Sequence, residues 1–260
     1  MKLEQESKSL SQERFGQFAE GYVTSQSHAK GYDLDQLVEI ANPQADWLVL
    51  DVATGGGHTA LKFASHVRKV IATDLTPKML AAAEKFIREQ GVINVSCEPA
   101  DAEELPFENG TFDLVTCRIA PHHFPDCARF IREGSRVLKV GGLLLVQDHV
   151  LPKDEAAARY IDSFERLRDP SHNRAFSHSE WAGMFEQADF QVKHAEEIIK
   201  HHQLIPWAER QGCSSEVIKH LRQMLIEASP KAAAWLQVEA IGTPETSFVN
   251  HHILIAGSKK

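Results

Sequence analysis

A glycine-rich turn followed by carboxylates at regular distances is the part of this 260-residue chain best suited to chemistry. Residues 48–57 read LVLDVATGGG, so an apolar run passes directly into three glycines. Glycines there let the backbone turn tightly and approach a ligand, and a helix starting near His58 would offer free N–H groups at its N-terminus. The same glycines would also suit a turn that only packs a helix against a strand, so the neighbouring residues have to decide.

Three carboxylates indicate the chemical class of the ligand that this turn would bind. Asp74 ends the next apolar run, 17 residues after Gly57, where an acidic side chain can accept hydrogen bonds from both hydroxyls of a ribose. Asp51 lies in the strand immediately before the glycines, where a carboxylate is unfavourable beside a pyrophosphate and useful near a cationic or amine-bearing group. Asp101, followed by Ala102, can accept a hydrogen bond from the exocyclic amine of adenine. Together they predict adenosine with a positively charged tail.

The elements that must position these residues alternate between strand and helix from residue 46 onward. Helical periodicity predicts a helix over 76–91, with Thr76 as N-cap and Pro77 at its first position, and another over 126–138. Short apolar runs predict strands at 47–51, 67–73, 94–97, 111–117 and 142–147. This order implies an α/β fold with a doubly wound, mostly parallel sheet, whose ligand lies at the carboxyl ends of the strands.

After residue 150 the pattern changes. Ser177 and Glu180 form a capping-box sequence that opens a helix. Residues 190–199 and 247–256 then predict two further strands separated by a long helical segment. An insertion of that length between neighbouring strands is either a cover for a substrate or structural padding.

Composition limits the classes of partner. The chain has 28 Lys and Arg against 36 Asp and Glu, a formal net charge of −8, without runs of basic residues longer than a pair. We therefore expect a small-molecule substrate and no nucleic acid. The charged N-terminus and the lack of a long apolar window predict a cytoplasmic protein without a membrane segment. The four cysteines form no C-x-x-C pair, which favours reduced thiols over a metal site or disulfides.

Several segments carry a resemblance to a known family. They are 50–57 (LDVATGGG), 74–80 (DLTPKML), 100–107 (ADAEELPF), 112–115 (FDLV) with 122–124 (HHF), 137–142 (VLKVGG) and 180–190. In order and spacing the chain resembles the class I S-adenosylmethionine-dependent methyltransferases, in the group similar to the ubiquinone/menaquinone biosynthesis C-methyltransferases. The resemblance covers about residues 15 to 200 and the final strand. Ala53 departs from the glycine usual at its position.

The resemblance implies S-adenosylmethionine as cofactor and a Rossmann-like sheet of seven strands, the last antiparallel. It implies a helical lid at 1–45, a cofactor domain at 46–200 with 247–260, and a helical insertion at 201–246. Asp51 and Gly55 would then lie near the amino-acid end of the cofactor and Asp74 at the ribose. The remaining cofactor-side residues would be Thr54 and Gly57 in the turn, Leu75 and Met79 beside the adenine, Asp101 and Ala102 at its edge, and Arg118 toward the cofactor carboxylate.

On the acceptor side, His122 and His123 follow the fourth strand, where an imidazole could remove a proton from the acceptor or simply pack. Tyr22, in the N-terminal segment, and His149, at the end of the fifth strand, also belong to the expected cleft. The histidine pairs at 201–202 and 251–252 predict no metal site, because adjacent residues in a strand point to opposite faces. Apolar residues of the insertion could line a pocket for a fairly apolar acceptor, and core packing of the same helices explains them equally well.

Two other functions compete. Gly55, Gly57 and Ala60 also satisfy the fingerprint of an NAD-dependent oxidoreductase, but Asp51, Asp101 and the lack of a Tyr-x-x-x-Lys sequence argue against it. A non-catalytic S-adenosylmethionine-binding protein would share the same binding residues. The leading hypothesis is a methyltransferase that acts on a small molecule.

Overall fold

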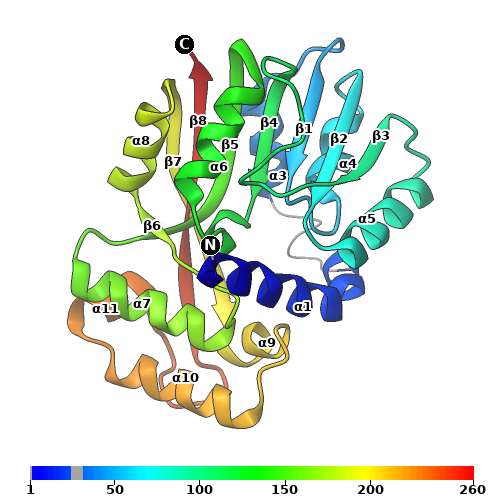
Figure 1. Cartoon of the computed structure of the whole chain (residues 1–260). Helices are drawn as coiled ribbons and strands as arrows, with labels where there is room; N and C mark the ends of the chain where they lie inside the picture. Colours follow the sequence, from blue (N-terminus) through cyan, green and yellow to red (C-terminus); the bar gives the residue numbers. More distant parts are fainter. Residues whose placement is uncertain (1, 25–31) are drawn as a thin grey trace.

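The computed structural model describes residues 2–24 and 32–260, and its centre is an eight-stranded sheet (Figure 1). The strand order is β3-β2-β1-β4-β5-β8-β7, with β6 paired to β5 outside this path. Neighbours among β1 to β5 run parallel, and β8 runs antiparallel to both β5 and β7. The strands are β1 Leu48–Val52, β2 Lys69–Asp74, β3 Val95–Pro99, β4 Phe112–Arg118, β5 Leu138–Leu151, β6 Phe176–Ser177, β7 Phe190–Gln203 and β8 Ser247–Lys259.

The predicted doubly wound sheet is confirmed, with the two-residue β6 as an addition to its seven strands. The described helices are α1 Lys2–Thr24, α3 Tyr32–Ala41, α4 His58–Ala64, α5 Pro77–Glu89, α6 Cys127–Val137, α7 Glu155–Arg168, α8 His178–Gln187, α9 Leu204–Glu209, α10 Ser215–Glu227 and α11 Pro230–Leu236, with a short 3-10 helix at Pro121–His123. Local signals place α5, which begins with Pro77, and α8, where the capping box of Ser177 and Glu180 forms. The sequence analysis did not anticipate α7.

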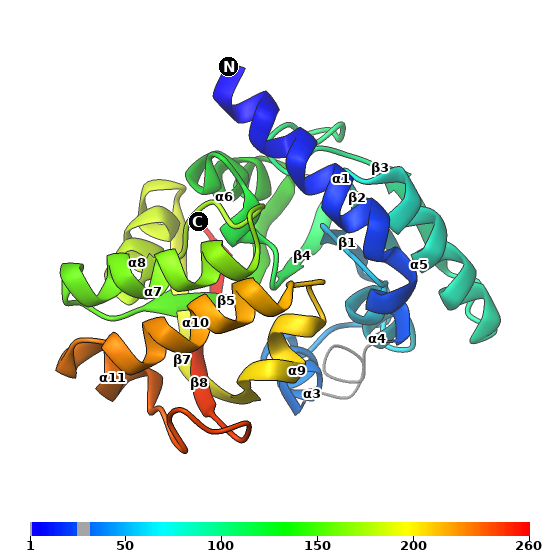
Figure 2. The same cartoon turned by 90° about the horizontal axis from the view of Figure 1, so that it is seen from below.

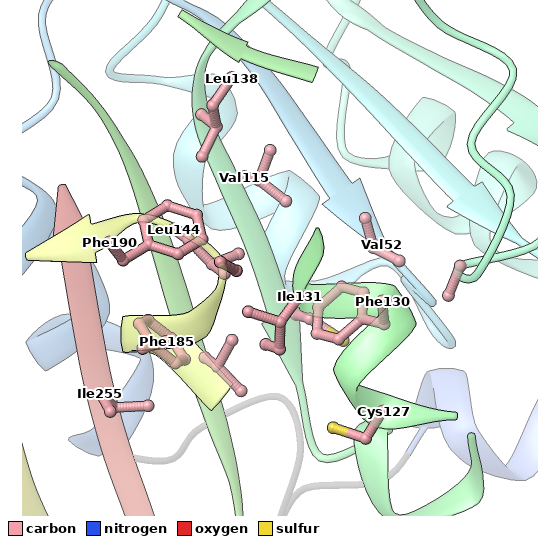
Figure 3. Close-up of a cluster of buried hydrophobic side chains, with 14 of the residues drawn as sticks. Val52, Val115, Cys127, Phe130, Ile131, Leu138, Leu144, Phe185, Phe190 and Ile255 are labelled. Atoms are coloured by element: carbon pink, nitrogen blue, oxygen red, sulfur yellow. The ribbon is translucent and has the colours of Figure 1, made fainter. Parts of the chain in front are cut away.

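Both faces of the sheet are covered by helices because successive strand residues point to opposite sides. On one face Val52, Val115 and Leu144 pack with Phe130 of α6 and Phe185 of α8, as Figure 3 shows. On the other face the intervening strand positions pack against α3, α4 and α5. That second cluster includes Leu37, Val49, Phe63, Ile87, Leu114 and Leu145. Two buried layers of this kind hold the carboxyl ends of β1, β2 and β4 at a fixed spacing.

A third apolar cluster joins α7 to the helices of the insertion. Phe164 of α7 stacks on Trp207 of α9, with ring centroids 5.2 Å apart and an interplanar angle of 9°. Phe248 of β8 packs edge-on against both rings. Because β7 continues to Gln203 and β8 starts at Ser247, these two long strands carry α9, α10 and α11 beyond the end of the central sheet (Figure 1). The insertion is helical, as expected, and α7 supplies part of its core.

Candidate functional site

One pocket lies at the carboxyl ends of β1, β2 and β4, beneath α1. Figure 2 shows α1 running across this end of the sheet. Lys8, Ser11 and Phe15 of α1 form one wall of the pocket. The sheet side contributes every predicted cofactor-side residue except Gly57: Asp51, Thr54, Gly55, Asp74, Leu75, Met79, Asp101, Ala102 and Arg118. The fold therefore gathers at one place residues that are spread over nearly seventy positions of sequence.

The two outer glycines of the turn have different tasks. Gly55 has a φ of +56° and lines the pocket, and a Cβ built on it would meet no atom within 4 Å. Gly57 has a φ of +82°, and a Cβ there would lie 2.9 Å from Ile87 Cδ1 and 3.2 Å from Ala83 Cβ. Gly55 thus leaves open space on the pocket side, whereas Gly57 allows the turn to pack against α5.

Asp51 brings a buried carboxylate to the pocket wall. The residue is 1% exposed, and its side chain accepts hydrogen bonds from Thr54 Oγ1 (2.5 Å) and Thr116 Oγ1 (2.7 Å). Burial raises the pKa of Asp51 to about 6, although the two hydroxyls and Arg118 oppose the rise. The surroundings therefore under-compensate the negative charge, and a cationic group in the pocket would be attracted to it.

Asp74 is held by the backbone. Its Oδ2 accepts a hydrogen bond from the Gly55 N–H (3.1 Å) and its Oδ1 from the Thr76 N–H (2.8 Å). Burial raises the pKa of Asp74, and these backbone bonds oppose the rise. The Thr76 side chain is a further hydrogen-bond partner of Asp74. A carboxylate has about four acceptor positions, so acceptor capacity remains for a hydroxyl of a ligand.

Asp101 is engaged by α1. Lys8 Nζ lies 2.6 Å from Asp101 Oδ2 and 2.6 Å from Glu103 Oε2, and the Glu103 N–H donates to Asp101 Oδ1 (2.9 Å). Sequence reasoning identified Asp101 and missed Lys8, because no local pattern links positions 93 residues apart. The ion pairs fasten α1 over the end of the pocket that Leu75, Met79 and Ala102 line.

Arg118 is paired inside the protein. Its Nε and Nη2 donate to Asp33 Oδ2 of α3 (3.2 and 3.0 Å), and Nε also donates to Gln147 Oε1 (3.1 Å). Lys200 Nζ adds a third bond to Asp33 Oδ2 (2.8 Å). The guanidinium predicted to meet a cofactor carboxylate lines the pocket, but a buried carboxylate of α3 already offsets part of its charge.

The predicted acceptor-side histidines separate into two groups. His122 and His149 lie outside the pocket lining, where the His122 N–H and Nδ1 both bond the buried Asp148 (2.7 and 2.6 Å). Burial lowers the pKa values of both histidines well below the usual range. The ring of His149 lies 4.6 Å from that of His122 and 4.5 Å from that of His252. These two side chains therefore do not reach the pocket.

His123 does reach the pocket. Its Nδ1 lies 3.0 Å from the carbonyl oxygen of Ser171, which can only accept a hydrogen bond. The neutral ring therefore carries its proton on Nδ1 and a lone pair on Nε2. Burial lowers the pKa of His123, so the ring is neutral near pH 7. The neighbouring pocket residues Phe15, Ile119 and Phe124 are apolar.

Tyr22 falls near the carboxyl end of α1, but its side chain lies outside the described part of the chain. Within residues 2–24 and 32–260, no group of three or more His, Cys, Asp or Glu side chains is arranged to hold a metal ion. Both ring nitrogens of His251, for example, are used, one with Glu197 Oε1 (2.6 Å) and the other with the carbonyl of Trp235 (2.8 Å). The same ranges contain no helix long and apolar enough to cross a bilayer.

Comparison with known proteins adds the family. The profile of the family described as "Methyltransferase domain" matches residues 50–146. The protein called "Uncharacterized methyltransferase YcgJ" from Bacillus subtilis is 37% identical over 248 residues, which cover 95% of this chain and 98% of the relative. The chain belongs to this methyltransferase family.

Solved structures agree with the sequence match. The crystal structure of YcgJ superposes with a TM-score of 0.85 at 36% identity, over 88% of this chain and 98% of that chain. A putative methyltransferase from Bacillus halodurans gives a TM-score of 0.84 at 37% identity, over 88% and 99%. The ubiquinone/menaquinone biosynthesis C-methyltransferase of Shewanella frigidimarina is 34% identical over 131 residues, 49% of this chain and 52% of the relative. The predicted membership of a methyltransferase family is thus confirmed.

Proposed function

We propose that this methyltransferase uses S-adenosylmethionine and methylates a small-molecule acceptor. The observation that carries the proposal is Asp51, a carboxylate on the pocket wall that is 1% exposed and is hydrogen-bonded by the hydroxyls of Thr54 and Thr116. Because burial disfavours its negative charge, the carboxylate would be stabilised by a further positive charge in the pocket. S-adenosylmethionine has a cationic sulfonium and an ammonium group, and either would supply that charge. A pyrophosphate, by contrast, would be repelled, which disfavours a dinucleotide.

The other residues of the pocket fit the same ligand. The remaining acceptor capacity of Asp74 suits a ribose hydroxyl, and the open space at Gly55 admits a ligand close to the backbone. Leu75, Met79 and Ala102 offer apolar surface for an adenine. We infer that Asp101 accepts the adenine amine while keeping or exchanging its bond to Lys8. In this proposal α1 is the lid and Gly57 supports the turn from beneath.

When bound, S-adenosylmethionine supplies an electrophilic methyl group, and its sulfur keeps the electrons of the broken carbon–sulfur bond as a neutral thioether. The protein's part is to hold the acceptor in line with that methyl group, a contribution that positioning alone can make large. The apolar end of the pocket at Phe15, Ile119 and Phe124 supports a largely apolar acceptor. We assign His123 Nε2 as the base that takes the acceptor's proton where one must leave.

The direct test is calorimetric titration of the protein with S-adenosylmethionine, S-adenosylhomocysteine and NADH in parallel. Saturable binding of the first two and silence of NADH are the expected outcome. Binding of NADH alone would overturn the proposal in favour of an oxidoreductase.

A variant sharpens this test. Asp74→Asn removes the charge and places an amide N–H₂ among backbone donors, so S-adenosylhomocysteine should bind 10- to 100-fold more weakly, or about 1.4 to 2.7 kcal/mol. Asp46→Asn is the matched control, because Asp46 is exposed and does not line the pocket. Equal affinities of the two variants would refute the ribose assignment.

A further inference from the structure

Asp169, directly after α7, joins three distant segments behind the pocket. The residue is 4% exposed. Its Oδ1 accepts hydrogen bonds from the N–H (3.0 Å) and the hydroxyl (2.5 Å) of Ser171, and its Oδ2 accepts one from Gln211 Nε2 after α9 (3.0 Å). Arg14 of α1 places Nε 3.3 Å from Asp169 Oδ1 and donates from Nη2 to the Gln211 carbonyl (3.0 Å). The carboxylate is thus the common partner of α1, the loop after α7 and the insertion.

The loop that Asp169 organises is the one that holds His123. The carbonyl oxygen of Ser171 accepts a hydrogen bond from the His123 ring Nδ1–H (3.0 Å), and the Ser171 hydroxyl oxygen lies 3.3 Å from the same nitrogen. The contacts through the Ser171 hydroxyl, 3.3 and 2.5 Å long, bring the carboxylate within about 6 Å of the imidazole. A charge at that separation acts on the ring directly, in addition to fixing the serine that orients it.

We propose that Asp169 is a positioning residue that holds His123 as its Nδ1–H tautomer and raises its affinity for a proton, and that Arg14 of α1 counteracts this charge. The inference rests on the proposed function in one respect: it is the assignment of His123 as base that gives the arrangement its purpose. When His123 takes a proton on Nε2, the Nδ1–H remains on the Ser171 carbonyl and the new positive charge faces Asp169. When α1 lies over the pocket, Arg14 is close to Asp169 and thereby lowers the proton affinity of His123.

Other groups around His123 also influence its proton affinity, in addition to Asp169 and Arg14. The ring of His122 lies 4.0 Å away, and His122 is itself bonded to Asp148 at the end of β5. His172, next to Ser171, and Asp148 also influence the pKa of His123. Phe15 of α1 covers the ring edge-on at 4.8 Å between centroids. Among these neighbours, only Asp169 is bonded both to the serine that receives Nδ1 and to the insertion.

The test is a titration of His123 by NMR in the full chain labelled with ¹⁵N-histidine, with its signal identified by its loss in His123→Gln. Near pH 7.5 the wild type should show a protonated Nδ1 and an unprotonated Nε2. Asp169→Asn should lower the pKa of His123 by about one unit, and Arg14→Gln should raise it by a similar amount. Glu155→Gln, an exposed substitution at the other end of α7, is the matched control and should leave it unchanged.

A purely structural role for Asp169 would not shift the pKa in opposite directions in the two variants. Shifts of the same sign, an unchanged pKa in both variants, or an Nε2–H tautomer in the wild type would overturn the proposal. If Asp169→Asn does not fold, Arg14→Gln decides alone, with an upward shift in support and no shift against. The titration needs neither cofactor nor acceptor, so its result is independent of whether S-adenosylmethionine binds.

Discussion

Replacing Gly57 with alanine should destabilise the protein far more than the same change at Gly55, two residues earlier. Both glycines have positive φ, which costs an alanine about 1 kcal/mol. At Gly57 the new methyl would also lie 2.9 Å from Ile87 Cδ1 and 3.2 Å from Ala83 Cβ, closer than carbon atoms pack. Overpacking of this kind costs a further 1 to 3 kcal/mol, so we expect a loss of about 3 kcal/mol at Gly57 and about 1 kcal/mol at Gly55.

Urea unfolding followed by circular dichroism measures the difference. With a slope of about 3 kcal/mol per molar urea, Gly57→Ala should lower the unfolding midpoint by about 1 M and Gly55→Ala by about 0.3 M. Ligand binding should show the reverse order. Gly55→Ala fills space on the pocket side and should weaken the binding of S-adenosylhomocysteine. The Gly57→Ala protein, measured where it is folded, should keep most of its affinity for the same ligand.

A second substitution identifies the cause of the loss. Ile87→Val removes Cδ1, the atom closest to the added methyl group, and should recover at least 1 kcal/mol of the Gly57→Ala loss in a double-mutant cycle. Equal midpoints for the two glycine variants, or costs that simply add when Ile87→Val is combined with Gly57→Ala, would refute the reasoning that packing against α5 explains Gly57.

Three further predictions concern the rest of the fold. Asp33→Asn leaves buried Arg118 without its counterion and should lower the free energy of unfolding by about 3 kcal/mol. Lys200→Met keeps the Arg118–Asp33 pair and should cost about 1 kcal/mol or less. Equal losses in urea unfolding would contradict the view that Asp33 is the counterion of Arg118. Phe164→Ala empties the core shared by α7 and α9 and should cost about 3 to 5 kcal/mol in the same assay, while a loss below about 1 kcal/mol would show that the cluster contributes little. Burial lowers the pKa of His202 to about 3, so below about pH 6.5 the unfolded chain binds a proton that the folded protein does not. Lowering the pH from 7.5 to 5.5 should therefore remove about 1.4 kcal/mol of stability through this residue, and His202→Phe should lessen the pH dependence by that amount.

The amino-acid sequence by itself determined the sheet, the turn and the carboxylates that meet at the pocket. Alternation of short apolar runs with helical periodicity implied parallel strands, whose carboxyl ends must meet at one edge. Asp51, Asp74 and Asp101 each follow or end such a strand, so their convergence followed from topology alone. The capping box at Ser177 and the proline at the start of α5 are likewise local, because they involve residues within a few positions of each other.

Only the tertiary structure decided which histidine reaches the pocket and which groups hold each histidine in place. His122 and His123 are adjacent in sequence, yet a buried partner at position 148 holds one and the carbonyl of Ser171 orients the other. The ion pairs of Lys8 with Asp101 and of Arg118 with Asp33 join residues 93 and 85 positions apart. Such pairs leave no periodic or local signal, because the chain that separates the partners must fold before they meet, and burial decides the charge of each group only after that.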